Sequence, residues 1–372
     1  MDMESAQRAA MARSLREASL NEGAGRGDAL YLTLHLNEGQ EVLFMVDTGA
    51  DGTILDQSLA AQLGEQFESR ILNDSSTGQK LTVQKYMAPR LSLEGTRLLT
   101  GIFVATLDLS HVRRDLGRPV MGILGTDCLE NYCIQLDFDS GKLRFLDPAR
   151  SSDEGLGTEF PLNITSAGQY VVRGNLLGVD GIDSEIDTGE TFTGRLEPKL
   201  FDEAVRNGKG SVNAKDVVRF SGVHATRTGR FSKCLFGKDT YRDLILDESR
   251  PTAIGLRFLA RHLVTLNYPR MKMYLKRRTG DLPVDQDDMS GLSLAQKGAA
   301  TIVQSVEKGS VGDQAGLRVS DVLQRVNGSP AEMMELWELR SVFQLGDGKE
   351  VAVSVQRGGE LKQLKLVLKK GI

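Results

Sequence analysis

The sequence predicts a mainly β protein in which two related β-rich lobes face each other across a pseudo-twofold axis, followed by a small α+β domain. Three observations lead to this fold class: strand-like alternation from Ala29 onward, two copies of the tripeptide Asp-Thr-Gly, and a later segment that occurs twice. A chain of 372 residues is long enough for two or three domains. Its 40% hydrophobic and 26% charged residues are typical of a globular protein.

Polar, Gly-containing breaks divide the chain into four parts. They lie at residues 21–28, 147–157 and 276–291. We therefore expect an N-terminal helix and linker over residues 1–28, a first lobe over 29–150, a second lobe over 158–278 and a C-terminal domain over 288–372. The helix is expected because the N-terminal segment is Ala-rich and charged.

Several classes of protein find no support in the composition. The net charge of −4 gives no reason to expect nucleic acid as a partner. No apolar stretch is long enough to span a membrane, and the N-terminus lacks the apolar core of a signal peptide. Three cysteines and four scattered histidines have neither the number nor the spacing of a disulfide framework or a zinc site. We expect no metal and no cofactor.

The two lobes are predicted from an internal repeat. The segment that starts at Gly125 aligns without a gap with the one that starts at Gly255, an offset of 130 residues, while the Asp-Thr-Gly motifs at Asp47 and Asp187 are offset by 140. Each copy reads as a short helix, a strand, a turn and a second strand. The matched apolar pairs are Leu129 and Leu259, Ile134 and Val264, Leu136 and Leu266, and Phe138 and Tyr268.

Two aspartates in matching contexts are suited to carboxylate-pair chemistry. Two carboxyl groups a few ångströms apart cannot both ionise, so the pair shares a proton. The ionised group can then take a proton from water while the protonated group gives one to a carbonyl oxygen. The Gly after each Asp-Thr permits a tight turn, and the Thr hydroxyl can hydrogen-bond across to the other loop.

The residues around Asp47 resemble a known family. VDTGADGTILD (46–56) is similar to the active-site loop of the retroviral-type aspartic proteases, and GILGTDCLENYCIQLDF (122–138) resembles a later segment of that family. Counted as two copies, the resemblance covers about residues 29–278, and the repeat places it with the fused, pepsin-like design. It implies an acid-protease fold and an aspartic endopeptidase, a hydrolase acting on protein or peptide substrates.

The resemblance also implies roles for individual residues. Asp47 and Asp187 would be the catalytic pair, Thr48 and Thr188 a hydrogen-bonded grip between the lobes, and Gly49 and Gly189 the support of the carboxylates. A β-hairpin flap is expected over residues 72–93 and a matching hairpin over 217–231. The implied substrate-binding residues are Ala50, Asp51, Ser76 and Gly78.

The second copy departs from the family pattern. Glu190 stands where Ala, Ser or Thr is usual, and Thr191 stands where the first copy has Asp51. A further carboxylate there is expected to add repulsion and raise neighbouring pKa values. Two alternatives therefore stay open: a catalytically inactive pseudo-protease that binds peptides as a scaffold, and a homodimeric protease that uses only Asp47.

The C-terminal part resembles a PDZ domain of bacterial type. The similar pieces are Ala-Gly-Leu at 315–317, SDVL at 320–323 and VNG at 326–328, followed by a helix expected to bury Met333 and Leu336. The resemblance implies binding of C-terminal peptides by strand addition, with Gly291, Leu292, Ser293 and Leu294 as the carboxylate-binding loop. A structural or autoinhibitory role is the alternative. Location is expected to be the bacterial periplasm or cell envelope if a signal peptide was removed, and otherwise the cytoplasm.

Overall fold

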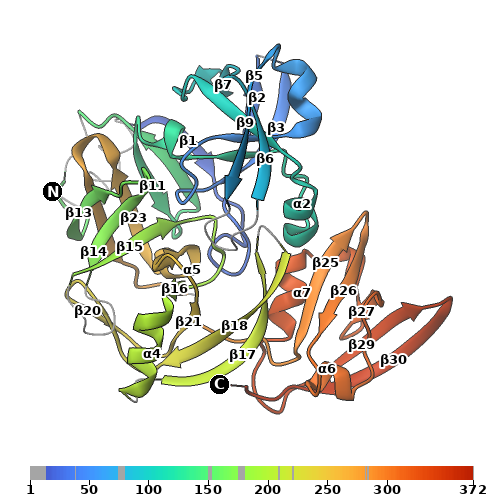
Figure 1. Cartoon of the computed structure of the whole chain (residues 1–372). Coiled ribbons are helices and arrows are strands. Elements are labelled where there is room, and N and C mark those ends of the chain that lie inside the picture. The colour runs from blue at the N-terminus through green and yellow to red at the C-terminus, as the bar shows by residue number, and fades with distance from the viewer. Residues whose placement is uncertain are drawn as a thin grey trace.

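The computed structural model describes residues 14–37, 39–73, 80–149, 153–174, 181–207, 210–219, 222–280, 282 and 285–371. Its architecture is dominated by three large sheets and short helices, so the mainly β prediction is confirmed (Figure 1). Two β-rich lobes lie one above the other in the view of Figure 1, and a smaller unit lies beside them. None of the helices in these described ranges is long and apolar enough to cross a membrane.

The first lobe is a nine-stranded sheet. Alternating burial along strand β2 (Tyr31–Leu36) places Leu32, Leu34 and Leu36 in the core. In spatial order its strands are β5 (Gln66–Asn73), β6 (Lys80–Met87), β9 (Phe103–Leu107), β4 (Ile54–Asp56), β10 (Gly122–Leu124), β3 (Gln40–Val46), β2 (Tyr31–Leu36), β7 (Leu91–Leu93) and β8 (Thr96–Arg97). Its helices are η1 (Gln57–Gln62), α2 (Ser110–Leu116) and α3 (Thr126–Leu129).

The second lobe repeats this arrangement within a thirteen-stranded sheet. Its strands, again in spatial order, are β14 (Tyr170–Gly174), β15 (Ile182–Asp187), β22 (Ala253–Gly255), β16 (Gly194–Leu196), β21 (Leu244–Glu248), β18 (Gly222–Phe231) and β17 (Gly210–Arg219). Helices α4 (Pro198–Arg206) and α5 (Leu256–Leu259) and the hairpin β19 (Cys234–Phe236) and β20 (Asp239–Tyr241) complete it.

Six further strands of the thirteen-stranded sheet join the lobes. They are β1 (Ser14–Ser19), β12 (Lys142–Leu146), β11 (Cys133–Asp137), β23 (His262–Asn267), β24 (Lys272–Arg277) and β13 (Thr158–Ile164), with the turn η3 (Tyr268–Arg270). Buried side chains of both lobes and this joining region form one continuous hydrophobic cluster. The lobes therefore fold around a shared core.

The pseudo-twofold axis passes between β11 and β23. Gln135 pairs with Thr265, its own equivalent at the offset of 130 residues, and its Nε2 donates to Thr265 Oγ1 at 3.1 Å. On either side, Ile134 pairs with Leu266, the equivalent of Leu136, and Leu136 pairs with Val264, the equivalent of Ile134. An antiparallel pair with this register is what a twofold axis through its centre requires.

The predicted N-terminal helix is wrong over its described part, because residues 14–19 form strand β1. This strand pairs antiparallel with β12 at the edge of the joining sheet. Glu17 accepts a hydrogen bond from Arg144 Nε at 2.8 Å and pairs with Lys142 at 3.1 Å. Sheet pairing with a distant segment thus outweighs the local helix propensity.

The C-terminal unit has its own core and its own six-stranded sheet. The expectation that Met333 is buried is wrong: its side chain is exposed because residues 331–333 form a separate turn, while Leu336 on α7 is buried. The elements are β25 (Leu292–Lys297), β26 (Ala300–Val306), α6 (Val311–Gln314), β27 (Val322–Val326), β28 (Ser329–Pro330), η4 (Ala331–Met333), α7 (Leu336–Val342), β29 (Glu350–Arg357) and β30 (Glu360–Val367).

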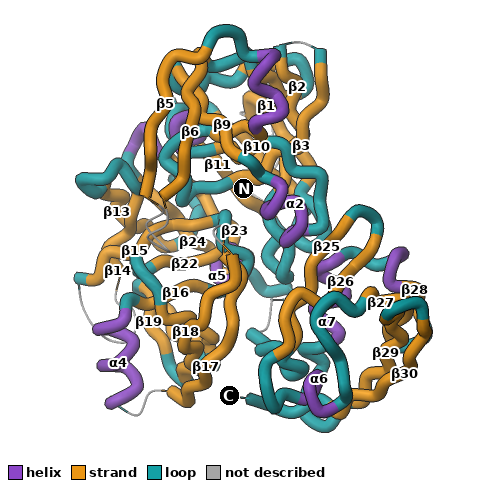
Figure 2. The backbone as a smooth tube through the Cα atoms, turned by 45° about the vertical axis from the view of Figure 1, so that its right-hand side comes forward, coloured by secondary structure: helices purple, strands orange, loops and turns teal. Residues whose placement is uncertain are grey.

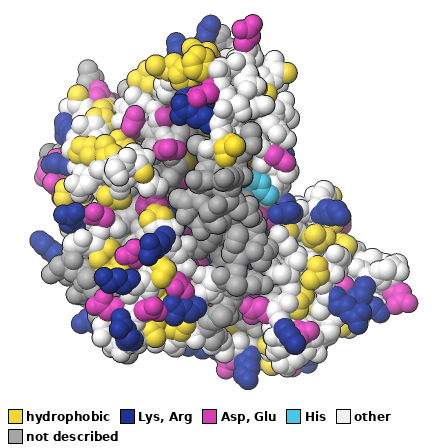
Figure 3. Space-filling model, in the orientation of Figure 1, with side chains coloured by type: hydrophobic (Ala, Val, Ile, Leu, Met, Phe, Trp, Pro, Cys, Tyr) yellow, Lys and Arg dark blue, Asp and Glu magenta, His cyan; other side chains and the backbone are white. Residues whose placement is uncertain are grey.

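This unit docks on the first lobe through α7 and β25, which lie against α2 (Figures 1 and 2). Arg340 on α7 donates to the carbonyl oxygens of Asp115 at 2.8 Å and Leu294 at 2.7 Å. Arg118 forms an ion pair with Glu335 at 3.0 Å. On the face seen in Figure 3, acidic and basic side chains of the described surface are interspersed.

Candidate active site

The two Asp-Thr-Gly turns lie at the ends of equivalent strands. Asp47 follows β3, which runs parallel to β10, and Asp187 ends β15, which runs parallel to β22. The Asp47 amide donates to Leu124 O at 3.0 Å, so the motif begins inside the sheet. Each aspartate is therefore held by a sheet where its chain turns away, as the sequence pattern predicted.

The threonines of the two motifs lock the lobes together by reciprocal hydrogen bonds. The Thr48 amide donates to Thr188 Oγ1, and the Thr188 amide donates to Thr48 Oγ1, both at 3.0 Å. Thr48 Oγ1 donates to Ile186 O at 2.6 Å, and Thr188 Oγ1 donates to Val46 O at 2.7 Å. Both side chains are buried, so these four bonds form away from competing water.

The glycines support the carboxyl groups and leave room for them. Gly49 N donates to Asp47 Oδ1 at 2.9 Å, and Gly189 N donates to Asp187 Oδ1 at 3.0 Å. A Cβ atom on Gly49 would lie 2.7 Å from Asp187 Cγ, and one on Gly189 would lie 2.5 Å from Asp47 Cγ. Each motif's glycine thus lies against the other motif's carboxyl group, and a side chain there would push the pair apart.

The two carboxyl groups interact directly. The carboxyl group of each motif lies against the glycine of the other, which brings Asp47 and Asp187 close enough for the charge of one to act on the other. Burial and, next, the charge of Asp187 raise the pKa of Asp47 to about 8. The structure thus brings together the six residues predicted as the pair and its support: Asp47, Thr48, Gly49, Asp187, Thr188 and Gly189.

A buried charged network surrounds Asp187. Arg195 Nη1 donates to Asp187 Oδ2 at 3.1 Å and also pairs with Glu190, while its Nη2 donates to Glu185 Oε2 at 2.6 Å. Glu190 therefore does not stand beside the aspartates as an uncompensated charge, which modifies the expected repulsion. The sequence interpretation missed Arg195 and Glu185. A position-by-position comparison of the copies would have found Arg195, since apolar Leu55 stands at its equivalent position.

The remaining predicted substrate-binding residues have different surroundings. Asp51 is exposed, and the Ala50 carbonyl accepts hydrogen bonds from Thr126 N at 2.8 Å and Thr126 Oγ1 at 3.0 Å. Ser76 and Gly78 lie outside the described residues. The strands β5 and β6 on either side of them pair antiparallel, as do β17 and β18 in the second lobe. These hairpins begin earlier than expected, at residues 66 and 210 instead of 72 and 217, and the first ends at residue 87 instead of 93.

The predicted carboxylate-binding loop of the C-terminal unit is engaged by the chain itself. Asp288 Oδ1 accepts hydrogen bonds from Ser290 N at 2.9 Å and Gly291 N at 2.8 Å. Burial raises the pKa of Asp288 to about 6. Gly291, Leu292 and Ser293 line a cavity of about 290 Å³, whereas Leu294 is buried in the core.

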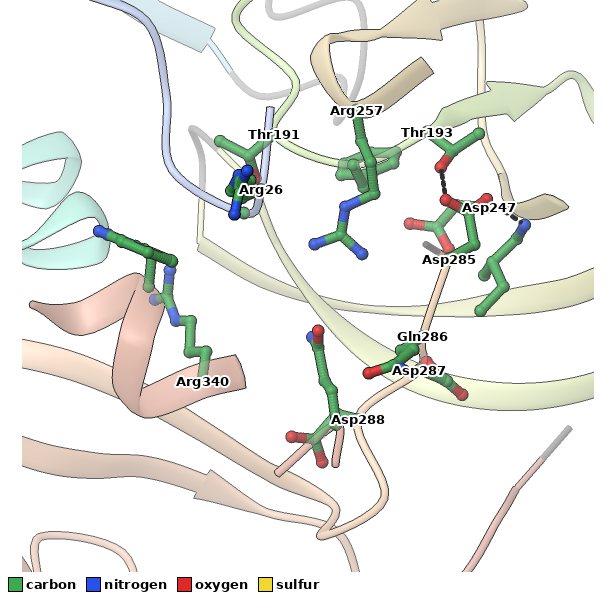
Figure 4. A pocket seen from close by; sticks show the side chains of 15 residues that line it. Arg26, Thr191, Thr193, Asp247, Arg257, Asp285, Gln286, Asp287, Asp288 and Arg340 are labelled. Carbon is green, nitrogen blue, oxygen red and sulfur yellow. Dashed lines mark hydrogen bonds between the residues drawn. The ribbon is translucent and has the colours of Figure 1, made fainter. Parts of the chain in front are cut away.

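A second cavity, of about 230 Å³, lies between the second lobe and the C-terminal unit (Figure 4). Its lining includes Thr191 and Thr193, which follow the Asp187 motif, but none of the six residues of the aspartate pair and its support. Asp285, from the connecting segment, accepts hydrogen bonds there from Thr193 Oγ1 at 2.6 Å and Arg261 Nη2 at 2.7 Å. This cavity marks where the C-terminal unit is fastened to the second lobe.

No metal centre is apparent in the described part of the chain. No group of three or more histidine, cysteine, aspartate or glutamate side chains there is arranged to hold an ion. The cysteines Cys128, Cys133 and Cys234 are buried, and none of them forms a disulfide with another.

Comparison with known proteins bears on the first motif. Residues 32–128 match the family model described as Aspartyl protease. This match supports an aspartic-protease type of function, and it includes Asp47 but ends before Asp187. No curated protein sequence gives a significant match. Among solved structures, the crystal structure of basic 7S globulin from soybean is similar with a TM-score of 0.42 and 14% identity, over 70% of this chain and 93% of that one.

Proposed function

We propose that this protein is a single-chain aspartic endopeptidase in which Asp47 and Asp187 together activate water for peptide-bond hydrolysis. The observation that carries the proposal is the reciprocal Thr48–Thr188 hydrogen bonding, which holds the two Asp-Thr-Gly turns together with each glycine against the other turn's carboxyl group. The family match over residues 32–128 supports the same activity. No cofactor enters the proposed reaction.

The proposed chemistry needs one proton on the pair. Water attacks the scissile carbonyl carbon while the ionised carboxylate takes a water proton and the protonated carboxyl gives its own to the carbonyl oxygen. The resulting gem-diol collapses with cleavage of the C–N bond. The leaving nitrogen takes a proton from one carboxyl group, and a gem-diol hydroxyl returns one to the other, so the pair ends with one proton.

The test is peptide hydrolysis by Asp47→Asn and Asp187→Asn variants, measured on a broad peptide library from acid to neutral pH. Each substitution is expected to reduce kcat/KM at least 10³-fold, roughly the scale on which loss of a catalytic acid or base acts. Glu65→Gln, which changes an exposed carboxyl in the first lobe, is the control and is expected to leave the rate unchanged. Full activity in Asp187→Asn would refute the fused pair and favour a homodimer that uses two copies of Asp47.

A second candidate function is a peptide-binding pseudo-protease. The observation that favours it is the hydrogen bond from Arg195 to Asp187 Oδ2. In the proposed reaction this carboxylate oxygen would otherwise be open to the attacking water. Hydrolysis of no library member, combined with saturable peptide binding that Asp47→Asn leaves intact, would select this candidate.

We also propose that residues 288–372 form a PDZ-like domain with a gating role. Contacts from within the same chain occupy the side of the domain that would bind a peptide. Three features support it. Asp288 accepts hydrogen bonds from amides of the loop, and Arg340 donates one to the Leu294 carbonyl on edge strand β25. Helix α2 lies against that same strand. The full chain is expected to bind C-terminal peptides weakly, and Arg340→Ser to bind them more tightly. Tight binding by the unaltered chain would contradict the gating role and favour substrate recruitment.

A further inference from the structure

The two copies of the repeat differ at three positions next to the aspartate pair, all of them buried in the second copy. In the second copy Glu185, Glu190 and Arg195 surround Asp187. At the offset of 140 residues, the first copy carries Met45, Ala50 and Leu55 at the same positions. The second copy therefore carries a charged set at the positions where the first copy carries an apolar set.

We propose that Arg195 is a positioning residue of the aspartate pair, which holds Asp187 as the carboxylate and thereby leaves the shared proton on Asp47. This inference rests on the proposed function and deepens it, because it assigns the general base of water attack to Asp187 and the general acid to Asp47.

The geometry of Arg195 fits this role. Its backbone lies in β16, next to β22, and its side chain is buried. The guanidinium donates through Nε to Pro251 O at 2.6 Å, through Nη1 to Asp187 and through Nη2 to Glu185. A planar guanidinium with several fixed donors restricts the orientation of each carboxylate that it binds.

The charges around the pair are unequal on its two sides. Among the described residues, Arg195 forms ion pairs with the carboxyl groups of Asp187, Glu185 and Glu190 but not with that of Asp47. A guanidinium beside a carboxyl group favours the ionised form of that group, whereas burial without such a partner favours the protonated form. The proton of the pair is therefore expected on Asp47.

Two further titratable groups, Glu185 and Tyr268, lie near the pair. Burial and, next, the charge of Asp187 raise the pKa of Glu185 to about 7, and Glu185 Oε1 has no hydrogen-bond partner among the described residues. Burial raises the pKa of the Tyr268 phenol on η3, and the charges of Tyr170, Glu130 and Asp47 add to this shift. Strands β10 and β22 contribute no charged side chain, since their sequences are GIL and AIG.

Replacing Arg195 alone would remove the positive charge that pairs with three buried carboxyl groups, so one variant exchanges the whole set. Glu185→Met, Glu190→Ala and Arg195→Leu together install the first copy's residues, which pack at the equivalent positions. Arg195→Lys keeps the charge but loses the guanidinium fork. The triple variant is expected to move the alkaline limb of the pH profile of kcat/KM toward acid by about one pH unit or more, since a nearby charge shifts a pKa by that amount. Arg195→Lys is expected to keep the limb and lose about tenfold in kcat, as for a misaligned catalytic group.

A second measurement does not depend on catalysis. Titration of ¹³C-labelled carboxyl groups by NMR, assigned with Asp47→Asn and Asp187→Asn, is expected to show the Asp47 carboxyl as the protonated member of the pair in the unaltered chain. In the triple variant the proton is expected to be shared more evenly. If the chain hydrolyses no peptide yet titrates in this way, the proposed function fails and the assignment stands. A proton on Asp187, or a triple variant with an unchanged titration, overturns the assignment. A rise in kcat on losing Arg195 also overturns it, because that result would mean that Arg195 blocks the Asp187 oxygen.

Discussion

At the scale of the residue, the site depends on contacts that tolerate no added atom. The Cβ distances at Gly49 and Gly189 show that each motif's glycine touches the carboxyl group of the other. The Asp-Thr-Gly sequence indicated that these residues act as a set, because the proposed chemistry needs a rigid aspartate, a hydroxyl and a residue without a side chain, and the structure brings the two motifs together. It did not predict Arg195, which lies in another strand and meets Asp187 only in the folded chain.

We expect Gly49→Ala and Gly189→Ala each to separate the carboxyl groups and abolish peptide hydrolysis while the chain stays folded. The matched control is Gly52→Ala in the same loop, where an added Cβ meets nothing within 4 Å. Circular dichroism and an activity assay at the optimum pH test the three variants together. Equal activity in Gly49→Ala and Gly52→Ala would contradict the close contact.

The raised pKa of Asp47 predicts a pH-dependent stability. A carboxyl whose pKa is about 8 when folded and 3.8 when unfolded binds more protons in the folded state between those values, so its contribution to stability is lost as pH rises. Asp47→Asn is therefore expected to gain stability relative to the unaltered chain from pH 4 toward pH 8, with a slope of at most about 1.4 kcal/mol per pH unit. Urea unfolding at several pH values measures it, and parallel curves for the two proteins would refute it.

At the scale of the element, the sequence pattern predicted the hairpins, which form between neighbouring segments, but not the strand that pairs with a distant segment. Alternation and turn residues located the hairpins β5–β6 and β17–β18, since a hairpin is formed by neighbouring segments. The strand β1 was predicted as helix because its pairing partner β12 is more than 120 residues away and leaves no trace in the local sequence. Likewise Met333 is exposed because a separate turn precedes α7, a break that the helical periodicity did not indicate.

Strand β1 is expected to stabilise the joining sheet rather than serve the chemistry. Replacing Glu17 by Gln removes one charge from a partly buried cluster with Arg144 and Lys142. The free energy of unfolding is expected to fall by about 1 kcal/mol, the scale of a charge-assisted hydrogen bond with partial exposure, with kcat/KM unchanged. Loss of activity at full stability would instead connect β1 to the site.

At the scale of the whole molecule, the repeat allowed the two-lobed architecture to be predicted, and the register at Gln135 and Thr265 agrees with a twofold axis. The position of the C-terminal unit could not be predicted, because it depends on side chains from three distant segments. The indole of Trp337, the single tryptophan of the chain, lies against Gly23 at this junction.

Trp337 therefore reports on docking. A Cβ on Gly23 would lie 2.7 Å from Trp337 Nε1, so Gly23→Ala is expected to displace the indole toward solvent and shift its emission to longer wavelength. Gly39→Ala, where an added Cβ meets nothing within 4 Å, is the control. An unchanged spectrum in Gly23→Ala would show that the unit is not held at this surface in solution.

The unequal surroundings of the two aspartates have a consequence for the substrate. A site built from two identical chains presents the same surface to a peptide running in either direction, so both directions of binding are equivalent. Here one half of the site carries Glu185, Glu190 and Arg195, and the other carries Met45, Ala50 and Leu55. We therefore expect a peptide to lie in this site with a single N-to-C polarity, and retro-inverso analogues of a good ligand to bind differently from their parents.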